Sequence, residues 1–314
     1  MQQDYKTLII YVLTLFVVVL LIVLKKQQDH LSELENEVIS DEEVKLVLDS
    51  LDKEPMKEDV PKETVIPMRG VIALIIDDFG YRNDHISNGF LELPAKLTYA
   101  IIPGHDHSQN FSKKAYDAGY EIIVHLPMEN IGKTYGEEEY VLMSYFQEDE
   151  IKQRINKSFA NLPEAVGLNN HQGSRGTADA RVMTLLAKEI KANKKFFIDS
   201  RTTRNSLAES TMRKYGVPTN KRDIFLDNDL DEEKITAQLL KLADVAERKG
   251  IAIGIGHVKP QTLSVLQREI PDLQKKVFDL SLLLNWFISF NANFMQSNPR
   301  RFNRKYSCNF CNGS

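Results

Sequence analysis

From residue 69 onwards, short apolar runs alternate with longer segments in which apolar residues recur every three or four positions. The short runs predict β-strands and the longer segments predict helices. The predicted strands cover residues 71–76, 97–102, 121–124, 165–168, 195–198, 223–226, 251–255 and 277–280. The predicted helices cover residues 84–92, 108–118, 148–162, 178–192, 206–215, 231–248 and 261–272. This alternation predicts a parallel α/β sheet, either closed as a barrel or open and doubly wound.

Residues 7–24 form an apolar run without charge, which Lys25 and Lys26 end. As a helix this run would be about 27 Å long, close to the hydrocarbon thickness of a bilayer. A cleaved signal peptide is the alternative, but its apolar region usually has about 7–15 residues and precedes a small-residue cleavage site. We therefore predict an uncleaved transmembrane helix, with residues 1–26 as a membrane anchor. The two lysines slightly favour a cytoplasmic location for the chain that follows.

The rest of the chain divides into three predicted parts. Residues 27–68 are rich in Glu and Asp, contain no aromatic residue and predict an acidic linker that can include a short helix. Residues 69–284 carry the alternating pattern and form the main domain. Residues 285–314 lack clear periodicity and predict a C-terminal tail outside the core. Cys308 and Cys311 in this tail form a lone C-x-x-C without the second ligand pair that a structural zinc site needs.

Composition excludes several classes of protein. Apolar residues make up 42% and charged residues 27% of the chain, which excludes a wholly disordered or fibrous protein. The net charge of −4 differs from the basic excess of general nucleic-acid binders, so no nucleic-acid partner is predicted. Because both cysteines lie in the tail, no thiolate is available in the main domain as a nucleophile or metal ligand.

Polar residues that can take part in catalysis follow nearly every predicted strand. In chain order they are Asp77 and Asp78; His125; Asn169, Asn170 and His171; Asp199 and Ser200; Asp227 and Asn228; and His257. In a parallel α/β fold the carboxyl ends of all strands lie on one face, where active sites form. We therefore expect these carboxylates and imidazoles to converge on this face, which we call the mouth.

Each of these residues also has a purely structural interpretation. Adjacent aspartates can cap helices or form turns, and a histidine can lie satisfied in a core or a polar loop. His105 and His107 are expected to lie in a solvated turn. Two motifs are set aside. The D-F-G of residues 78–80 lacks the H-R-D loop of protein kinases, and the G-x-G of residues 254–256 lacks the third glycine of a dinucleotide-binding loop.

The cluster of carboxylates and imidazoles suits metal-assisted hydrolysis. One Asp and two His can hold Zn²⁺, or another borderline divalent metal, and leave one position open for water. Such a metal lowers the pKa of bound water to about 7 and polarises a carbonyl group. A second Asp can accept the proton of the water, and a further His can protonate a leaving amine. The set therefore fits hydrolysis of an amide or an ester.

Six motifs in order give the chain a family resemblance. They are Ile75-Ile76-Asp77-Asp78-Phe79-Gly80, His125-Leu126-Pro127-Met128-Glu129, Asn169-Asn170-His171-Gln172-Gly173-Ser174, Asp199-Ser200-Arg201-Thr202, Phe225-Leu226-Asp227-Asn228 and Ile255-Gly256-His257. With these motifs the chain resembles the divergent polysaccharide deacetylases, relatives of the metal-dependent carbohydrate esterases that remove N- or O-acetyl groups. The resemblance runs over residues 69–284, roughly two thirds of the chain.

This resemblance implies a distorted (β/α) barrel of the polysaccharide-deacetylase type. It implies Asp77 as the catalytic base and Asp78 as a ligand of a divalent metal, for which Zn²⁺ is the predicted ion. The H-x-x-x-H motif of typical deacetylases is broken, because Glu129 lies four positions after His125. We therefore assign the metal to Asp78, His125 and His171. The Arg-x-Pro-Tyr motif of those enzymes is also missing.

Further roles are assigned within the same motifs. His257, as the proton donor to the leaving group, and Asp199 are expected to join Asp77 in catalysis. The residues expected to bind substrate are Asn170, Ser174, Ser200 and Asp227.

The predicted function is a membrane-anchored, metal-dependent hydrolase that removes acetyl groups from a polysaccharide of the cell envelope. The resemblance implies a catalytic domain on the extracytoplasmic, periplasmic side, against the weak charge bias of Lys25 and Lys26. The alternative is a non-catalytic envelope protein of the same fold that binds glycan or a protein partner. A third hypothesis, a hydrolase of phosphoesters, would more typically show the ligands of two metals.

Overall fold

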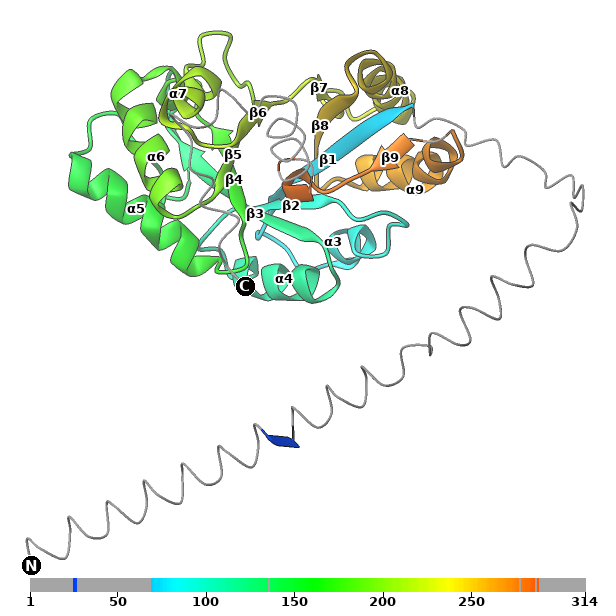
Figure 1. Ribbon diagram of the computed structural model, residues 1–314, viewed down its shortest axis with the longest axis horizontal. Helices are drawn as coiled ribbons and strands as arrows, with labels where there is room; N and C mark the ends of the chain where they lie inside the picture. Colours follow the sequence, from blue (N-terminus) through cyan, green and yellow to red (C-terminus); the bar gives the residue numbers. More distant parts are fainter. Residues whose placement is uncertain (1–24, 27–68, 135, 277, 286, 288–314) are drawn as a thin grey trace, which may run out of the picture. The chain divides into compact units, whose positions relative to one another are not determined.

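A computed structural model describes residues 25–26, 69–134, 136–276, 278–285 and 287 (Figure 1). Within these residues nine strands form one sheet in the order β6-β5-β4-β3-β2-β1-β8-β7, with β9 paired to β1. The strands are β1 (Gly70–Phe79), β2 (Thr98–Ile101), β3 (Glu121–Met128), β4 (Gly167–Gln172), β5 (Phe196–Asp199), β6 (Thr219–Lys221), β7 (Ile224–Phe225), β8 (Ile251–His257) and β9 (Phe278–Leu280). All pairs are parallel, which confirms the predicted parallel α/β sheet.

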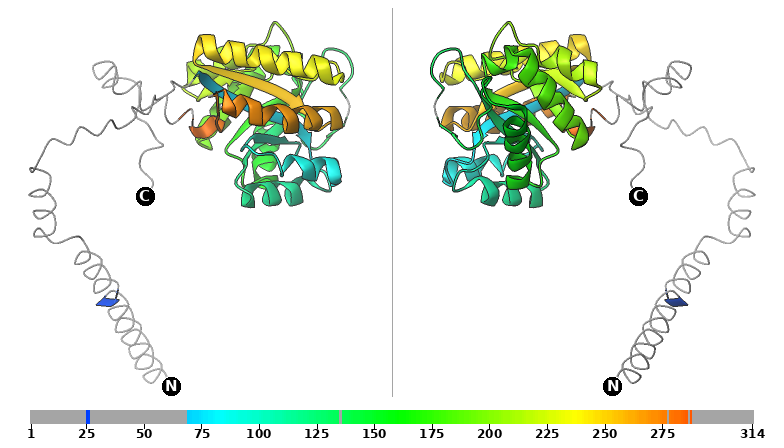
Figure 2. Two further views of the ribbon diagram at one scale, coloured as in Figure 1. Left: turned by 90° about the vertical axis from the view of Figure 1, so that its right-hand side faces the viewer. Right: turned by 90° about the vertical axis from the view of Figure 1, so that its left-hand side faces the viewer.

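The sheet curls into a half-barrel, with β6 and β7 as its two edges and helices on its outer face (Figures 1 and 2). The helices are α3 (His85–Phe90), α4 (Ser108–Asp117), α5 (Glu148–Asn161), the 3₁₀ turn η1 (Gly176–Ala178), α6 (Ala180–Ala192), α7 (Ala208–Tyr215), α8 (Glu232–Lys249) and α9 (Pro260–Lys275). Aspartate side chains begin several of them. Asp179 and Asp231 accept hydrogen bonds from backbone N–H groups in the first turns of α6 and α8.

Alternation along the strands creates two apolar layers. In β1, Ile72, Leu74 and Ile76 pack in the cluster that the helices cover, whereas Ala73 and Ile75 belong to a second cluster inside the curl. Because successive strand residues point to opposite sides, the inner face continues from Ile75 to Asp77. Apolar residues thus fill the inside of the half-barrel, and polar residues follow them at the carboxyl ends of the strands.

The inner layer continues past residue 284, where the tail was predicted to begin. Phe287 is buried against Phe196 of β5, with ring centroids 5.1 Å apart. Glu121, at the start of β3, accepts hydrogen bonds from the backbone N–H groups of Leu283 and Leu284 at 3.1 and 2.8 Å. This segment therefore packs at the amino-terminal end of the strands, opposite the expected mouth. The remainder of the predicted tail lies outside the described residues.

Most strands differ by a few residues from the predicted bounds, and two of these differences change the picture. β4 extends through Gln172, so the polar Asn-Asn-His run lies within the strand and not after it. The single strand predicted at residues 223–226 is replaced by β6 and a two-residue β7. Pairing with neighbouring strands, which local sequence does not encode, sets both limits.

The predicted membrane anchor, residues 1–26, and the acidic linker, residues 27–68, lie outside the described residues apart from Lys25 and Lys26. None of the helices in the described part of the chain is long and apolar enough to cross a membrane.

Candidate active site

A bulge at the end of β1 brings two consecutive carboxylates to the same mouth. The β1–β2 register shifts between Ile76 and Phe79, so Asp77 and Asp78 together oppose one residue of β2. Asp78 has a left-handed φ of 70°, which aspartate tolerates better than most residues. A bulge re-aims a side chain that would otherwise point to the opposite side of the strand. Both carboxylates therefore reach the same imidazole, that of His125.

Asp78 forms a compact group with His125 of β3 and His171 of β4, which we call the Asp–His cluster. Asp78 Oδ1 lies 3.3 Å from His125 Nε2 and 3.2 Å from His171 Nδ1. One potential ligand atom from each residue lies within 4.8 Å of the other two. These are the three residues that were predicted to hold the metal.

The spacing of this group fits a divalent ion. Ligand atoms about 2.0–2.1 Å from a tetrahedral Zn²⁺ lie about 3.3 Å from one another. Asp78 Oδ1 is buried and, although both imidazoles are near, it makes no hydrogen bond of good geometry. A cation facing its lone pairs would account for such an oxygen. The His125 side chain is 3% exposed, but those of Asp78 and His171 are 25% and 15% exposed, so the group is open on one side.

The electrostatics of Asp78 favour a bound cation. Burial raises the pKa of Asp78, but close polar contacts with His125 and His171 and the charges of His125 and His257 outweigh it and hold this pKa well below its usual range. The carboxylate is therefore ionised at neutral pH, as a metal ligand must be.

Asn169 connects His125 with Asp77. Asn169 Oδ1 accepts a hydrogen bond from His125 Nδ1 at 2.7 Å, and Asn169 Nδ2 donates to Asp77 Oδ1 at 2.8 Å. Because the amide must donate to the carboxylate, its oxygen faces the imidazole and the ring proton lies on Nδ1. The lone pair of His125 Nε2 is then free for a metal, an arrangement that typically tunes metal-binding histidines. No role was predicted for Asn169 from the sequence.

His171 is held from its other nitrogen by Gln172. Gln172 Nε2 lies 3.1 Å from His171 Nε2, and Gln172 Oε1 accepts a hydrogen bond from Asn130 Nδ2 at 2.6 Å. A metal on His171 Nδ1 requires the ring proton to be on Nε2. Reversal of both the Gln172 and the Asn130 amides, each of which exchanges oxygen and nitrogen, would give that proton an acceptor and keep a hydrogen bond between the two amides.

His257, at the end of β8, is paired in register with Asp77 of β1. Asp227 accepts hydrogen bonds from His257 Nδ1 at 2.8 Å, from the His257 backbone N–H at 2.6 Å and from Thr262 Oγ1 at 2.6 Å. Burial lowers the pKa of His257, but the hydrogen bond to Asp227 and the charges of Asp77 and Asp78 outweigh it and raise the pKa to about 9. His257 is therefore protonated at neutral pH and can act as an acid.

Asp77 has the environment of a general base. Its Oδ2 lies 3.6 Å from His125 Nε2, and the side chain is buried. Burial raises the pKa of Asp77, against the charges of His125 and His257 and the hydrogen bond from Asn169. A carboxylate with a raised pKa beside a metal site is suited to proton transfer.

Comparison with known proteins identifies the family to which this site belongs. A family model described as divergent polysaccharide deacetylase matches residues 74–284. The chain belongs to the divergent polysaccharide deacetylase family. The matched region begins in β1 and ends after β9, so it includes every residue of the cluster.

The chain is also similar in sequence to two bacterial proteins. The chain is 35% identical over 206 residues to the uncharacterized protein YibQ of Escherichia coli K12, a match that covers 66% of this chain and 64% of YibQ. It is 31% identical over 210 residues to an uncharacterized protein of Haemophilus influenzae, covering 66% of this chain and 73% of that protein. The chain therefore spans less than two thirds of the length of YibQ.

The fold of this domain also occurs in a solved structure. The crystal structure of the uncharacterized protein ATU2773 from Agrobacterium tumefaciens superposes with a TM-score of 0.65 at 19% identity, covering 68% of this chain and 87% of that one. At this identity the likeness concerns the fold alone.

Two of the residues predicted for the site point away from the mouth. Asp199 follows Phe197 on the helix-facing side of β5, and its carboxylate accepts hydrogen bonds from Arg201 N and Ser206 Oγ, both at 2.8 Å. Asn170 accepts a hydrogen bond from the backbone N–H of Ser200 at 2.9 Å. Because strand residues alternate, the inward-facing residues of β4 are Asn169 and His171 rather than Asn170.

The other predicted substrate-binding residues differ in their surroundings. Asp227 is bound to His257 as described, and its side chain is buried. Ser174 Oγ accepts a hydrogen bond from the backbone N–H of Ile131 at 2.8 Å. Ser200 Oγ is buried and has no hydrogen-bond partner among the described residues. Of this set, Ser200 is the one whose side-chain oxygen is left unpaired among the described residues, but that oxygen is enclosed and not open to a substrate.

Glu129, which interrupts the H-x-x-x-H spacing, contacts two loops near the site. Its Oε2 accepts a hydrogen bond from the backbone N–H of Ser144 at 2.6 Å, and its Oε1 lies 3.5 Å from Arg175 Nε. The second imidazole of the cluster comes instead from His171 on the neighbouring strand.

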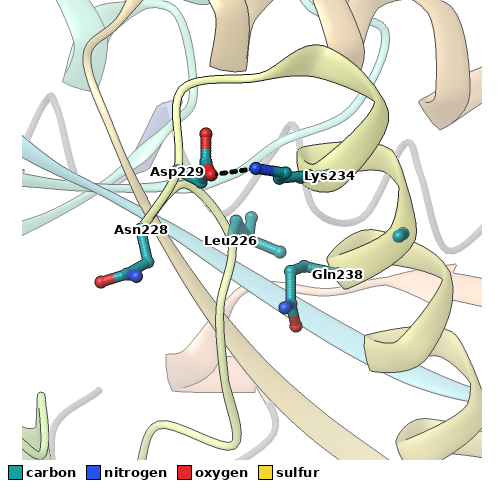
Figure 3. A pocket seen from close by; sticks show the side chains of 6 residues that line it. Leu226, Asn228, Asp229, Lys234 and Gln238 are labelled. Atoms are coloured by element: carbon teal, nitrogen blue, oxygen red, sulfur yellow. Dashed lines mark hydrogen bonds and ion pairs between the residues drawn. The ribbon is translucent and has the colours of Figure 1, made fainter.

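A cavity of about 200 Å³ lies between the loop after β7 and helix α8 (Figure 3). Its lining residues are Leu226, Asn228, Asp229, Lys234, Ala237 and Gln238. None of them belongs to the Asp–His cluster, and an ion pair between Asp229 and Lys234 spans the cavity wall. The chemistry is therefore assigned to the strand ends and not to this cavity.

Proposed function

We propose that the protein is a metal-dependent hydrolase that removes acetyl groups from a polysaccharide of the cell envelope. One observation carries this proposal: a ligand group of one Asp and two His lies beside the buried carboxylate of Asp77, and Asp77 is paired in register with the protonated His257 on the next strand. Family membership supports a carbohydrate substrate. A protein that only binds glycan has no need for this combination of groups.

Asp78, His125 and His171 would hold the ion, for which we propose Zn²⁺. When bound, such an ion is a Lewis acid that activates water and polarises the acetyl carbonyl. Asp77 accepts a proton from the attacking water, and Asn169 orients both Asp77 and His125. His257 donates its proton to the departing nitrogen or oxygen of the sugar as the bond to the acetyl carbon breaks. Acetate and a sugar with a free amine or hydroxyl are the products.

Acetate release by the full-length, Zn²⁺-loaded protein tests the proposal. The substrates are N- and O-acetylated oligosaccharides of several sugars, and release from at least one of them is expected. A protein that binds these oligosaccharides but releases acetate from none is instead a non-catalytic glycan-binding protein of the same fold.

The fall of kcat/KM at alkaline pH, which we call the alkaline limb, is expected to follow the deprotonation of His257. As a proton donor His257 must be protonated, so activity is present below its pKa and is lost as the pH rises through about 9. In Asp227→Asn the main interaction that raises this pKa is removed, and the limb should move toward the ordinary histidine value of about 6.5. The measurement is kcat/KM against pH with metal content checked at each pH. A limb at the same pH in both proteins would argue against the donor role.

We also propose that residues 7–24 anchor the protein and that its catalytic domain is periplasmic. The apolar run and the envelope substrate support this topology. Alkaline phosphatase, which is active outside the cytoplasm, should be active when fused after Ser314. Activity of a reporter that works only in the cytoplasm, fused at the same place, would reverse the topology.

A further inference from the structure

The loops that follow β1, β2 and β3, at the same end of the sheet as the Asp–His cluster, meet around an exposed tyrosine. Tyr81 lies on the loop after β1, three positions beyond Asp78, and is 48% exposed. His105 lies on the loop after β2, and Glu137 on the long loop after β3. We call Tyr81, His105 and Glu137 the rim triad.

The ring of Tyr81 is held by the other two members of the rim triad. Tyr81 OH donates a hydrogen bond to Glu137 Oε1, and His105 Nε2 lies 3.2 Å from the same oxygen. The rings of Tyr81 and His105 are 4.1 Å apart at their centroids and inclined by 46°. The Glu137 side chain is only 4% exposed, and its backbone has a left-handed φ of 53°. A buried carboxylate on a strained backbone thus fixes an aromatic ring that remains half exposed. His105 lies in the predicted turn, but its side chain is only 28% exposed because it packs on Tyr81.

The loops beneath the rim triad are also locked together. Gly80 has a φ of 117°, and a Cβ there would lie 2.7 Å from Ser108 Oγ and 2.9 Å from the carbonyl oxygen of Ile102. Ser108 Oγ donates to that carbonyl at 2.6 Å and accepts from the backbone N–H of His105 at 3.1 Å. The close approach of the β1 and β2 loops therefore sets the position of Tyr81 relative to Asp78.

The exposed ring has the properties of a contact for a sugar. One face of a pyranose carries C–H groups that pack on an aromatic ring, while its hydroxyl groups stay in water. Burial, the hydrogen bond to Glu137 and the negative charges of Glu137 and Asp78 all raise the pKa of Tyr81, so its hydroxyl group stays protonated and the ring stays neutral. Fixing the ring before binding reduces the entropy lost on binding.

We propose that Tyr81 is a binding platform for a sugar ring of the acetylated polysaccharide, held ready by Glu137 and His105. This proposal rests on the proposed function, because it concerns how the same substrate is held. Tyr81 takes no part in proton transfer, so it contributes to binding and not to the chemical step.

The test compares kinetics and binding in full-length variants. Tyr81→Ala should raise KM about tenfold with kcat within about twofold, the pattern expected when an interaction is equally strong in the ground and transition states. Tyr81→Phe keeps the ring and should retain most of the affinity. Tyr116→Ala is the matched control, because Tyr116 is 54% exposed on α4 but lies in the last turn, away from the strand ends. Zn²⁺ content should be unchanged in all three.

A double-variant cycle tests the role of Glu137. Because Glu137 acts through the ring, Glu137→Ala should weaken binding in the presence of Tyr81 and have little further effect in Tyr81→Ala. Effects that add fully would mean that Glu137 acts independently of the platform, which would overturn this part of the proposal.

Binding without turnover separates this proposal from the proposed function. The probes are tetramers of N-acetylglucosamine and O-acetylated xylose, titrated calorimetrically into the Asp77→Asn protein with and without Tyr81→Ala. Binding that weakens about tenfold with Tyr81→Ala supports the platform. Equal binding overturns the platform and leaves the proposed function in place. If the Asp77→Asn protein binds neither tetramer and the wild-type protein releases acetate from no substrate, the proposed function fails and the platform fails with it.

Discussion

Replacement of Asp78, His125 or His171 by alanine is expected to remove the divalent metal and to lower acetate release by more than about a hundredfold, because loss of an orienting partner alone typically lowers metal affinity or activity about 10–100-fold. Each side chain supplies one ligand atom to a group whose members lie within 4.8 Å of one another. Removal of one leaves two ligands and a position that water must fill. The measurements are Zn²⁺ per protein by elemental analysis and Zn²⁺ affinity by competition with a chelator.

Two further variants make this result specific. His85→Ala removes an exposed histidine on α3 and should leave metal content unchanged. Asn169→Leu removes the hydrogen bonds to His125 and Asp77 but no ligand, so its loss should stay within about 10–100-fold. Circular dichroism and thermal unfolding show whether each variant folds. Full Zn²⁺ occupancy in folded His171→Ala would contradict the ligand assignment.

Asp77→Asn and His257→Ala are expected to keep the metal and to lower kcat by about 10²–10⁴-fold each, the usual contribution of a general base or acid. Asparagine has the shape of Asp77 but cannot accept the proton of the attacking water. Alanine at position 257 leaves no donor for the leaving group, while Asp227 keeps its contact with Thr262. The measurements are kcat for acetate release and Zn²⁺ content on the same preparations.

A matched control for the base is Glu121→Gln. Glu121 is also a buried carboxylate, but it lies at the start of β3 and binds Thr98 and the segment after β9. Its replacement should change thermal stability and leave kcat nearly unaltered. If Asp77→Asn retains the wild-type kcat while metal is bound, the proton acceptor is another group and the proposed mechanism is wrong.

The sequence alone determined the elements, the family and the general position of the chemistry. Apolar runs and helical periodicity are local properties, so they predicted a parallel α/β sheet. Polar residues directly after strands predicted a shared mouth, since parallel strands end on one face. The motifs around Asp77, His125 and His257 identified the family because the residues of each motif are adjacent in the chain.

Only the tertiary structure decided which of these side chains meet. The bulge at Asp77 and Asp78 depends on pairing with β2, so the sequence could not show that both carboxylates reach His125. The pairing of β3 with β4 brings Asn169 beside His125. The bounds of β4 in the structure show that Asn169 and His171 face inward and that Asn170 faces the opposite side, because successive strand residues alternate.

The contacts of Asp199, Asp227 and His105 likewise could not be predicted from the sequence. Carboxylates after strands look alike in sequence, yet Asp199 holds a turn on the helix-facing side while Asp227 holds His257. His105 looked like part of a solvated turn, but Glu137, thirty-two positions later, brings it to Tyr81. Local sequence determines which residues come to the ends of strands. Strand register and packing between distant loops determine which atoms they contact there, because these depend on residues far apart in the chain.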